Sequence, residues 1–125
     1  MKSILVIPAL NPPAHLLEYV DQLIASGAEH LVLVDDGSAS EYKPIFEKLS
    51  EHPQCHILTH TVNQGKGRAL KDAFAYILEQ PQWAGLGVIT ADSDGQHLAA
   101  DIRRMDQKME GGSLSPAWLP QFPSG

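Results

Sequence analysis

Two carboxylates separated by one residue are the most informative feature of this 125-residue sequence. Asp92 and Asp94 stand in the run DSDGQH at residues 92–97. Carboxylates at this spacing on a turn can reach a single hard cation, and Mg²⁺ and Mn²⁺ commonly take one or two carboxylates together with the phosphates of a substrate. The alternative is that both aspartates only cap the turn and the helix after it. An isolated Asp-x-Asp pair does not decide between these interpretations.

A second acidic run, DDGS at residues 35–38, also has two interpretations. Asp and Ser are common caps of a turn that leads from a strand into a helix. A carboxylate in this position can instead accept hydrogen bonds from the base edge or the ribose hydroxyls of a nucleoside. The second interpretation gains weight from the expected fold, which places this run one strand away from Asp92 and Asp94.

A third run, NQGKGR at residues 63–68, concentrates positive charge at the start of a predicted helix, and Lys71 follows it closely. It is not a Walker A phosphate loop, because the first glycine of that motif and the Ser or Thr after its lysine are missing. Positive side chains at the positive end of a helix dipole are unfavourable unless a negative group compensates them. Either an anionic ligand or Asp72 together with solvent can supply that compensation.

The elements that must position these runs alternate between apolar strands and amphipathic helices. Because most strands are apolar throughout, we expect a mostly parallel sheet covered on both faces, an α/β fold of the doubly wound type. Right-handed crossovers give the strand order 3-2-1-4, and ligands bind where that order reverses, beyond the carboxyl ends of strands 1 and 4. The acidic runs fall at that edge. The predicted strands are residues 2–9, 31–34, 55–59 and 87–91, and the predicted helices lie around residues 16–24, 42–49, 70–78 and 98–109.

Two details of these helices are specific enough to be checked. Asn11 is expected to cap the first helix, with the prolines after it in the first turn, and Gly27 is expected to end that helix. The last helix is expected to bury Ile102, Met105 and Met109.

The composition excludes several classes of protein. The formal net charge of −6 disfavours a nucleic-acid partner, because phosphate contacts need clustered Lys and Arg. The single cysteine, Cys55, excludes an internal disulfide and gives no support to a zinc site. The longest apolar run, residues 4–10, is far too short to span a membrane, and the N-terminus lacks the apolar stretch of a signal peptide. We therefore expect a small cytoplasmic protein with no transmembrane segment, for which peripheral membrane contact stays open.

The order and spacing of four motifs resemble those of the inverting glycosyltransferases of family 2, which have the nucleotide-sugar-binding GT-A fold. The resemblance covers residues 1 to about 110 and continues past the last motif to Asp101 and Ile102. The Asp-x-Asp-Gly-Gln-His form is most similar to the branch that makes polyprenyl-phosphate sugars. The four motifs are VIPALN at residues 6–11, LVDDGS at residues 33–38, NQGKG at residues 63–67 with Ala69, and DSDGQH at residues 92–97.

The resemblance implies a site for a UDP- or GDP-linked sugar and for one Mg²⁺ or Mn²⁺ ion. Pro8, Ala9 and Asp36 would line the nucleoside pocket, with Asp36 contacting the base. Lys66 would approach the diphosphate, and Asp94 would be the catalytic carboxylate. The metal and the diphosphate would be held by Asp92, Asp94 and Gln96. The residues expected to bind the nucleotide sugar are Pro8, Ala9, Leu10, Asn11, Asp35, Asp36, Lys66, Asp92 and Ser93.

The sequence departs from the family pattern at Leu10, where an aromatic residue is frequent, and at Pro12, where Glu is frequent. The domain of the family also continues with a later half that supplies the acceptor pocket and, in many members, the general base. We therefore expect the N-terminal half of a truncated GT-A domain, with a nucleotide-sugar-binding subdomain at residues 1–110. Residues 111–125, which are rich in Gly, Ser and Pro, are expected to form an irregular tail.

The reaction implied by the resemblance displaces a nucleoside diphosphate from the anomeric carbon of a sugar with inversion, and the metal stabilises the leaving group. A polyprenyl phosphate suits this reaction as the acceptor, since a phosphate monoester with a second pKa of about 6 is already largely ionised at neutral pH. The alternative is a non-catalytic nucleotide-binding module that forms a homodimer or pairs with a partner chain through an exposed sheet edge. A nucleotidyltransferase is disfavoured, because no Gly-rich loop follows the first strand.

Overall fold

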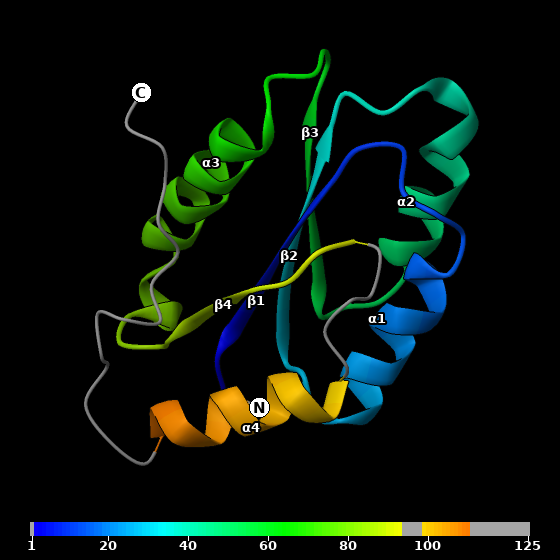
Figure 1. Ribbon diagram of the computed structural model, residues 1–125. Coiled ribbons are helices and arrows are strands. Elements are labelled where there is room, and N and C mark those ends of the chain that lie inside the picture. Colours follow the sequence, from blue (N-terminus) through cyan, green and yellow to red (C-terminus); the bar gives the residue numbers. More distant parts are fainter. Residues whose placement is uncertain (1, 94–98, 111–125) are drawn as a thin grey trace.

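The computed structural model describes residues 2–93 and 99–110 (Figure 1). These residues form a parallel sheet with the strand order β3-β2-β1-β4 and helices on both faces. The doubly wound α/β class and the strand order 3-2-1-4 that the sequence predicts are confirmed. The predicted tail at residues 111–125 lies outside the described residues.

The sheet is built around two central strands that are almost entirely buried, because helices cover them on both faces. These two strands pair along their whole length, and a further strand lies on each side of them. The strands are β1 (Ile4–Ala9), β2 (His30–Asp36), β3 (Cys55–His60) and β4 (Val88–Thr90).

The strand register gathers polar residues at one edge of the sheet. Ala9 at the end of β1 lies opposite Asp35, and Asp36 at the end of β2 lies opposite His60 at the end of β3. The residues that follow these strands therefore start from neighbouring positions, although they are far apart in the sequence. This edge is the one at which the topology predicts a ligand site.

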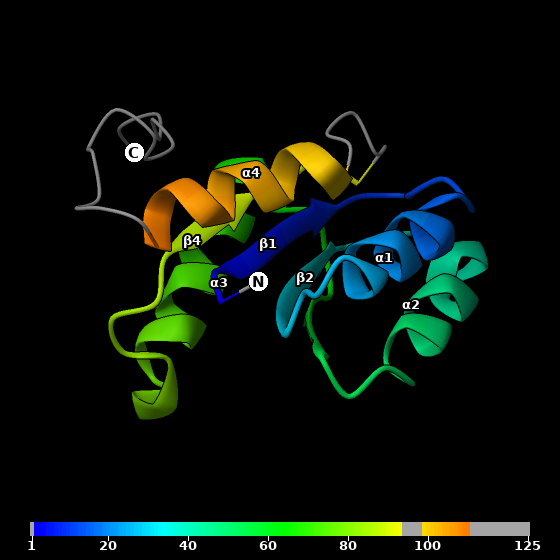
Figure 2. The same ribbon diagram turned by 90° about the horizontal axis from the view of Figure 1, so that it is seen from below.

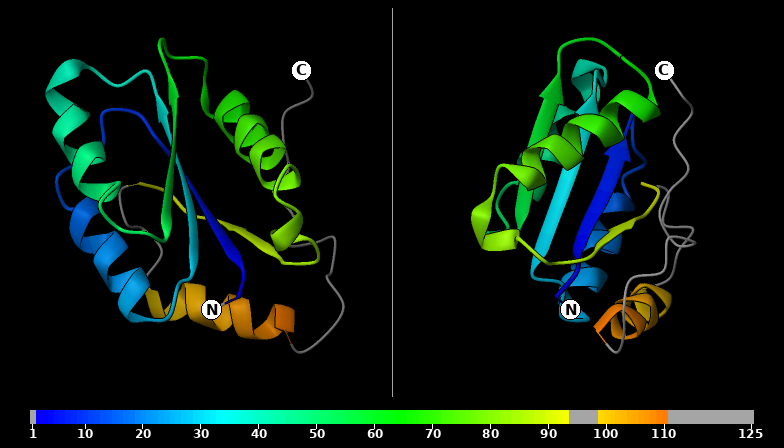
Figure 3. Two further views of the ribbon diagram at one scale, coloured as in Figure 1. Left: turned by 180° about the vertical axis from the view of Figure 1, so that it is seen from behind. Right: turned by 90° about the vertical axis from the view of Figure 1, so that its left-hand side faces the viewer.

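The helices form two layers, and the strand side chains alternate between them. The helices are α1 (Leu16–Ala25), α2 (Lys43–Leu49), α3 (Lys66–Leu78) and α4 (Ala99–Glu110), and the 3₁₀ turns are η1 (Ser40–Tyr42) and η2 (Pro81–Trp83). Leu5 and Ile7 pack in the layer with α1, α2 and α4, whereas Ile4 and Val6 pack with α3 on the opposite face (Figure 3). Figure 2 shows α4 beside α1 and β4. None of these described helices is both long and apolar enough to cross a membrane.

The ends of α1 confirm one prediction and correct another. Gly27 ends the helix as predicted, with a positive φ of 104° that lets the chain leave it. The predicted N-cap is wrong, because α1 begins at Leu16 and Asn11 does not cap it. A residue that precedes a proline is disfavoured in the helical conformation, and two consecutive prolines follow Asn11. The helix begins three residues after the second proline, at Leu16.

The last helix, α4, presents a different face to the sheet from the one predicted. Ile102 is fully buried as expected, whereas Met105 is 38% exposed and Asp106 is buried instead. The carboxylate of Asp106 accepts a hydrogen bond from the backbone N–H of Ser3 at 2.7 Å, which compensates its burial and attaches α4 to the start of β1. The side chain of Met109 lies outside the described part of the chain.

We expect Asp106→Ala to lower the free energy of unfolding by about 1–3 kcal/mol, because a buried N–H would lose its acceptor. Asp101→Ala is the matched control on the same helix. Asp101 is a partly exposed residue that pairs with Arg104, so its loss should change the free energy by less than about 0.5 kcal/mol. Urea unfolding followed by circular dichroism measures both. Equal stability of the two variants would contradict an anchoring role for Asp106.

Candidate functional site

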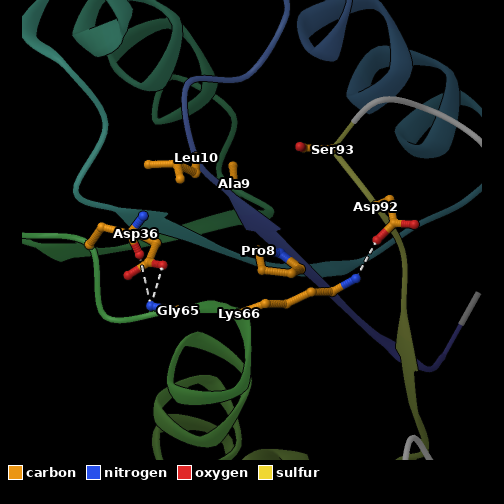
Figure 4. Close-up of a pocket in the computed structure, with 9 residues that line it drawn as sticks. Pro8, Ala9, Leu10, Asp36, Gly65, Lys66, Asp92 and Ser93 are labelled. Carbon is orange, nitrogen blue, oxygen red and sulfur yellow. Dashed lines mark hydrogen bonds and ion pairs between the residues drawn. The ribbon is translucent and has the colours of Figure 1, made fainter.

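A cavity of about 330 Å³ opens at the edge of the sheet where β1, β2 and β4 end (Figure 4). It lies where the strand order reverses between β1 and β4, the position that the topology predicts. Its volume is at the lower end of the range for small-molecule sites, roughly 300–1,000 Å³. The lining residues are Pro8, Ala9, Leu10, Asp36, Asn63, Gly65, Lys66, Asp92 and Ser93.

Most residues predicted to bind a nucleotide sugar line this cavity. They are Pro8, Ala9, Leu10, Asp36, Lys66, Asp92 and Ser93. Two further predicted residues, Asn11 and Asp35, are not part of the lining, and the predicted metal ligands Asp94 and Gln96 lie outside the described residues. The structure therefore brings the predicted runs together, and the binding of a nucleotide sugar there stays a prediction.

Asp36 joins the end of β2 to the loop between β3 and α3. Its side chain is only 5% exposed. Its Oδ1 accepts a hydrogen bond from the N–H of Gln64 at 2.9 Å and contacts Nδ1 of His60 at 2.8 Å, while Oδ2 accepts one from the N–H of Gly65 at 3.0 Å (Figure 4). Hydrogen bonds to an ionised group are strong and directional. The cavity is therefore lined by a carboxylate of fixed orientation.

The side chain of Asp35 lies on the face of the sheet opposite to that of Asp36, since side chains alternate along a strand. Its carboxylate accepts hydrogen bonds from the N–H of Ser38 at 2.9 Å and from Nζ of Lys43 at 2.5 Å. Burial by itself would raise the pKa of Asp35, but the hydrogen bonds from Lys43 and Ser38 outweigh it and hold the pKa below the usual 3.8. The oxygens are buried and engaged, so the geometry gives Asp35 the role of holding the turn after β2 and does not favour the predicted contact with a nucleotide sugar.

Asn11 links the loop after β1 to the turn after β2. Its N–H donates to Oγ of Ser38 at 2.9 Å, and its Oδ1 accepts a hydrogen bond from the N–H of Ala39 at 2.9 Å. Its φ of 47° lies in the left-handed region, which Asn tolerates better than most residues. Asn11 therefore shapes the loop that brings Leu10 to the cavity, and this position does not favour the direct contact with a nucleotide sugar that the sequence predicts.

Lys66 and Asp92 form an ion pair of 2.8 Å at the cavity (Figure 4). Their side chains are 64% and 35% exposed, so water and salt screen the pair and its net contribution to stability is small. Lys66 is the first residue of α3, and the N-terminus of that helix adds positive partial charge. The described residues contain no group of three His, Cys, Asp or Glu that could hold a metal ion. Asp92 has a partly exposed carboxylate, a type of ligand that a hard cation takes when it is bound together with a phosphate.

Sequence reasoning did not name Asn63 and Gly65, which line the cavity, as binding residues. His60, which lies beside the cavity, is a third residue that it did not identify. It lies against Asp36, and its other ring nitrogen, Nε2, contacts Oδ2 of Asp72 at 2.7 Å. The hydrogen bond with Asp36 is the main influence that raises the pKa of His60 above its usual 6.5. Partial burial opposes this influence, and Asp72 adds to it. The only signal in the sequence is that Asp36 and His60 closely follow two predicted strands, residues 31–34 and 55–59, which become neighbours in the sheet.

Gly37 allows the turn after β2 to pack closely against the loop between β3 and α3. Its φ is 77°, and a Cβ at this position would lie 2.3 Å from the backbone N of Asn63 and 2.4 Å from the backbone C of Val62. Backbone atoms cannot move aside as the end of a flexible side chain can. The missing side chain of Gly37 is therefore what lets the two loops approach each other and lets Asp36 reach the N–H of Gly65.

Comparison with known proteins gives the family of this chain. A model of the family described as Glycosyl transferase family 2 matches residues 4–117. The chain belongs to glycosyl transferase family 2. The resemblance that the four motifs indicate is thereby confirmed.

Individual proteins and a solved structure are also similar to this chain. The chain is 31% identical over 100 residues to an uncharacterized protein of Methanocaldococcus jannaschii, with 80% of this chain and 38% of that protein covered. It is 30% identical over 115 residues to undecaprenyl-phosphate 4-deoxy-4-formamido-L-arabinose transferase of Shewanella sediminis, with 86% of this chain and 33% of that protein covered. The crystal structure of S. aureus TarS shares the fold, with a TM-score of 0.58 and 20% identity over 89% of this chain and 33% of that one. The chain thus spans about a third of the length of these proteins.

We expect Gly37→Ala to lower the free energy of unfolding of this family 2 chain by at least about 3 kcal/mol, because backbone strain is combined with overlap of backbone atoms. Gly85→Ala is the matched control. Gly85 has a similar φ of 83°, but a Cβ there meets no atom within 4 Å, so only strain of about 1–2 kcal/mol is added. Thermal unfolding measures both variants. If both lose the same stability, the close packing at Gly37 does not have the importance that we assign to it.

Proposed function

We propose that this chain forms the donor-binding part of an inverting glycosyltransferase, which transfers a sugar from a nucleotide-diphosphate sugar to an acceptor with Mg²⁺ or Mn²⁺. One observation carries this proposal: Asp36, Lys66 and Asp92, from three separate segments, line one cavity where the strand order reverses. A hydrogen-bond acceptor, a cation and an accessible carboxylate are the groups that a nucleoside, a diphosphate and a metal ion require. Membership of family 2 supports glycosyl transfer as the reaction.

The nucleoside would bind at the end of the cavity formed by residues 8–10 and Asp36. Among the described residues, Oδ1 of Asp36 is approached by two hydrogen-bonding groups and Oδ2 by one. A carboxylate oxygen can accept two hydrogen bonds, so Oδ2 retains acceptor capacity for a ring N–H of the base. Pro8, Ala9 and Leu10 add apolar surface beside it, without an aromatic ring for the base to stack on.

The diphosphate would bind beside Lys66 and the N-terminus of α3, where side-chain charge and helix-end charge are both positive. A hard divalent cation would be held by Asp92, which offers an accessible carboxylate, and by the predicted ligands Asp94 and Gln96, which lie outside the described residues and would add further oxygen atoms. When bound, such an ion supplies electrostatic stabilisation to the charge that develops on the departing diphosphate. Lys66 acts on the same charge through its ammonium group, which can turn from Asp92 toward the phosphate oxygens.

A polyprenyl phosphate is the acceptor that best fits this proposal. The relative from Shewanella sediminis is named as a transferase that acts with undecaprenyl phosphate. A phosphate monoester with a second pKa of about 6 is already largely ionised at neutral pH, so attack by its oxygen needs no protein base. The phosphate oxygen forms a bond to the anomeric carbon while the nucleoside diphosphate leaves from the opposite side, and the configuration inverts.

We expect nucleotide sugars to bind at least about tenfold more tightly with Mn²⁺ or Mg²⁺ than without it. Asp94→Ala should remove this metal dependence, because a predicted ligand is lost. Asp101→Ala, which removes a carboxylate of α4 outside the cavity lining, should leave it unchanged. Calorimetric titration with a panel of UDP- and GDP-linked sugars, with and without metal, measures the effect. Affinities that do not change on adding metal would contradict the proposed site.

The same panel, assayed for hydrolysis, separates a catalytic domain from the alternative of a non-catalytic nucleotide-binding module. A catalytic domain releases sugar slowly to water even without its acceptor. A module that only binds should show no release, and analytical ultracentrifugation should then show a dimer, for which β4, an edge strand of the described sheet, is a candidate contact. A monomer that hydrolyses nucleotide sugars excludes the module.

A further inference from the structure

His60 lies between two carboxylates directly behind the cavity. Its Nδ1 is 2.8 Å from Oδ1 of Asp36, and its Nε2 is 2.7 Å from Oδ2 of Asp72. The side chain of His60 is only 9% exposed, so water competes little for either nitrogen. Asp36 comes from β2, His60 from β3 and Asp72 from α3, so the imidazole connects three elements.

The geometry requires a particular charge on this histidine. Ionised carboxylates only accept hydrogen bonds, and a neutral imidazole carries a single N–H. Both short contacts of His60 are therefore satisfied only when both ring nitrogens carry a proton, which is the imidazolium form. The charged groups around it are Asp36 and Asp72, with Arg68 beyond Asp72 at 3.1 Å from its Oδ1. The two negative charges nearest to the ring stabilise the same protonated form, in agreement with the raised pKa of His60.

This cation holds together the two ends of the cavity. Asp36 is bound on one side by His60 and on the other by the N–H groups of Gln64 and Gly65, which directly precede Lys66. On its far side, His60 binds the helix that Lys66 begins, through Asp72. His60 thus links the two parts of the proposed site. On one side it contacts Asp36, the carboxylate proposed to contact the base. On the other side it contacts α3, the helix that begins with Lys66, which is proposed to contact the diphosphate.

We propose that protonated His60 is a positioning residue of the donor site. It holds the Asp36 carboxylate and the N-terminus of α3 in the arrangement that binds the nucleotide. The affinity for the nucleotide therefore falls when His60 loses its proton. This proposal rests on the proposed function. A neutral His60 donates to only one of its two carboxylates, and its other nitrogen then faces an oxygen with no proton between them. The contact to Asp36 or to Asp72 opens, and the cavity loses its fixed geometry.

The direction of the pH dependence follows from this charge. The contribution of His60 is complete where the imidazole is protonated and is lost as the pH rises through its pKa, which lies above 6.5. UDP-glucose and GDP-mannose are suitable probes, because their diphosphate groups do not titrate in this range. With Mg²⁺ at a saturating concentration, we expect their affinity to fall about fivefold to tenfold between about pH 6 and about pH 8.5.

Two variants separate this role from a purely structural one. Asp72→Asn removes one of the two charges that stabilise the imidazolium but keeps an acceptor oxygen for Nε2, so the affinity at low pH should be retained and the midpoint of the pH profile should move to lower pH. His60→Gln should bind weakly at every pH, because its amide does not titrate and donates to one carboxylate at most. A stabilising role alone would alter unfolding in these variants without moving the pH profile of the affinity.

The ionisation of His60 can also be followed directly by NMR titration of the imidazole resonances, even where His60→Gln does not fold. By thermodynamic linkage, a ligand that prefers the protonated form tenfold raises the pKa of His60 by about one unit. The resonances of His52, which pairs with Asp21 away from the cavity lining, are the internal control for effects of the ligand on the whole chain. An upward shift of the His60 pKa on adding a nucleotide sugar supports the proposal.

Two other outcomes overturn the proposal, and they are distinguishable. If the wild-type chain binds the nucleotide sugars with an affinity that is independent of pH, or if ligand leaves the pKa of His60 unchanged, His60 does not position the site although the proposed function stands. If the wild-type chain binds neither probe at any pH with Mg²⁺ present, the proposed function itself fails and the role of His60 fails with it.

Discussion

The arrangement of the cavity depends on one buried carboxylate, that of Asp36. Two backbone N–H groups of the loop before α3 and one imidazole nitrogen from β3 converge on it. Because Lys66 follows Gly65 in the chain, the hydrogen bond that fixes Gly65 also fixes the neighbouring lysine. The positions of the nucleoside end and the diphosphate end of the proposed site are thus coupled through the hydrogen bonds of Asp36. A change that displaces Asp36 is transmitted to both ends.

The two adjacent aspartates at the end of β2 lie on opposite faces of the sheet, and each has a partner on its own face. Asp35 is paired with Lys43 at the start of α2, and Asp36 is paired with His60 at the end of β3. Each carboxylate is buried and has its own cationic group, as buried charges require. Gly37 then turns the chain without a side chain that would separate the loops. Three consecutive residues of β2 and its turn, Asp35, Asp36 and Gly37, therefore connect both helical layers to the cavity.

Sequence reasoning predicts the fold well because the responsible patterns are local. The apolar runs that form β1 and β2 and the crossover rule are enough to give the strand order, and the runs after the strands then fall at one edge. It is less accurate where the outcome depends on packing. Asp106 replaces Met105 on the buried face because Ser3 offers it a backbone partner, a contact between residues about a hundred positions apart. The role of His60 is hidden for the same reason, since its two partners come from separate elements.

The exposed ion pair between Lys66 and Asp92 has a consequence for how a charged ligand can enter. In the structure, each of these groups is the counterion of the other at the cavity. Under the proposed function, a diphosphate that arrives with a divalent ion would bring both signs of charge, so the ammonium could pass to the phosphate while the carboxylate passes to the ion. One ion pair would be exchanged for two, and no group at the mouth would have to stand uncompensated during the exchange. Because the pair is exposed and screened by water and salt, separating its two members costs little, so the proposed ligand would meet no strong internal ion pair on entering.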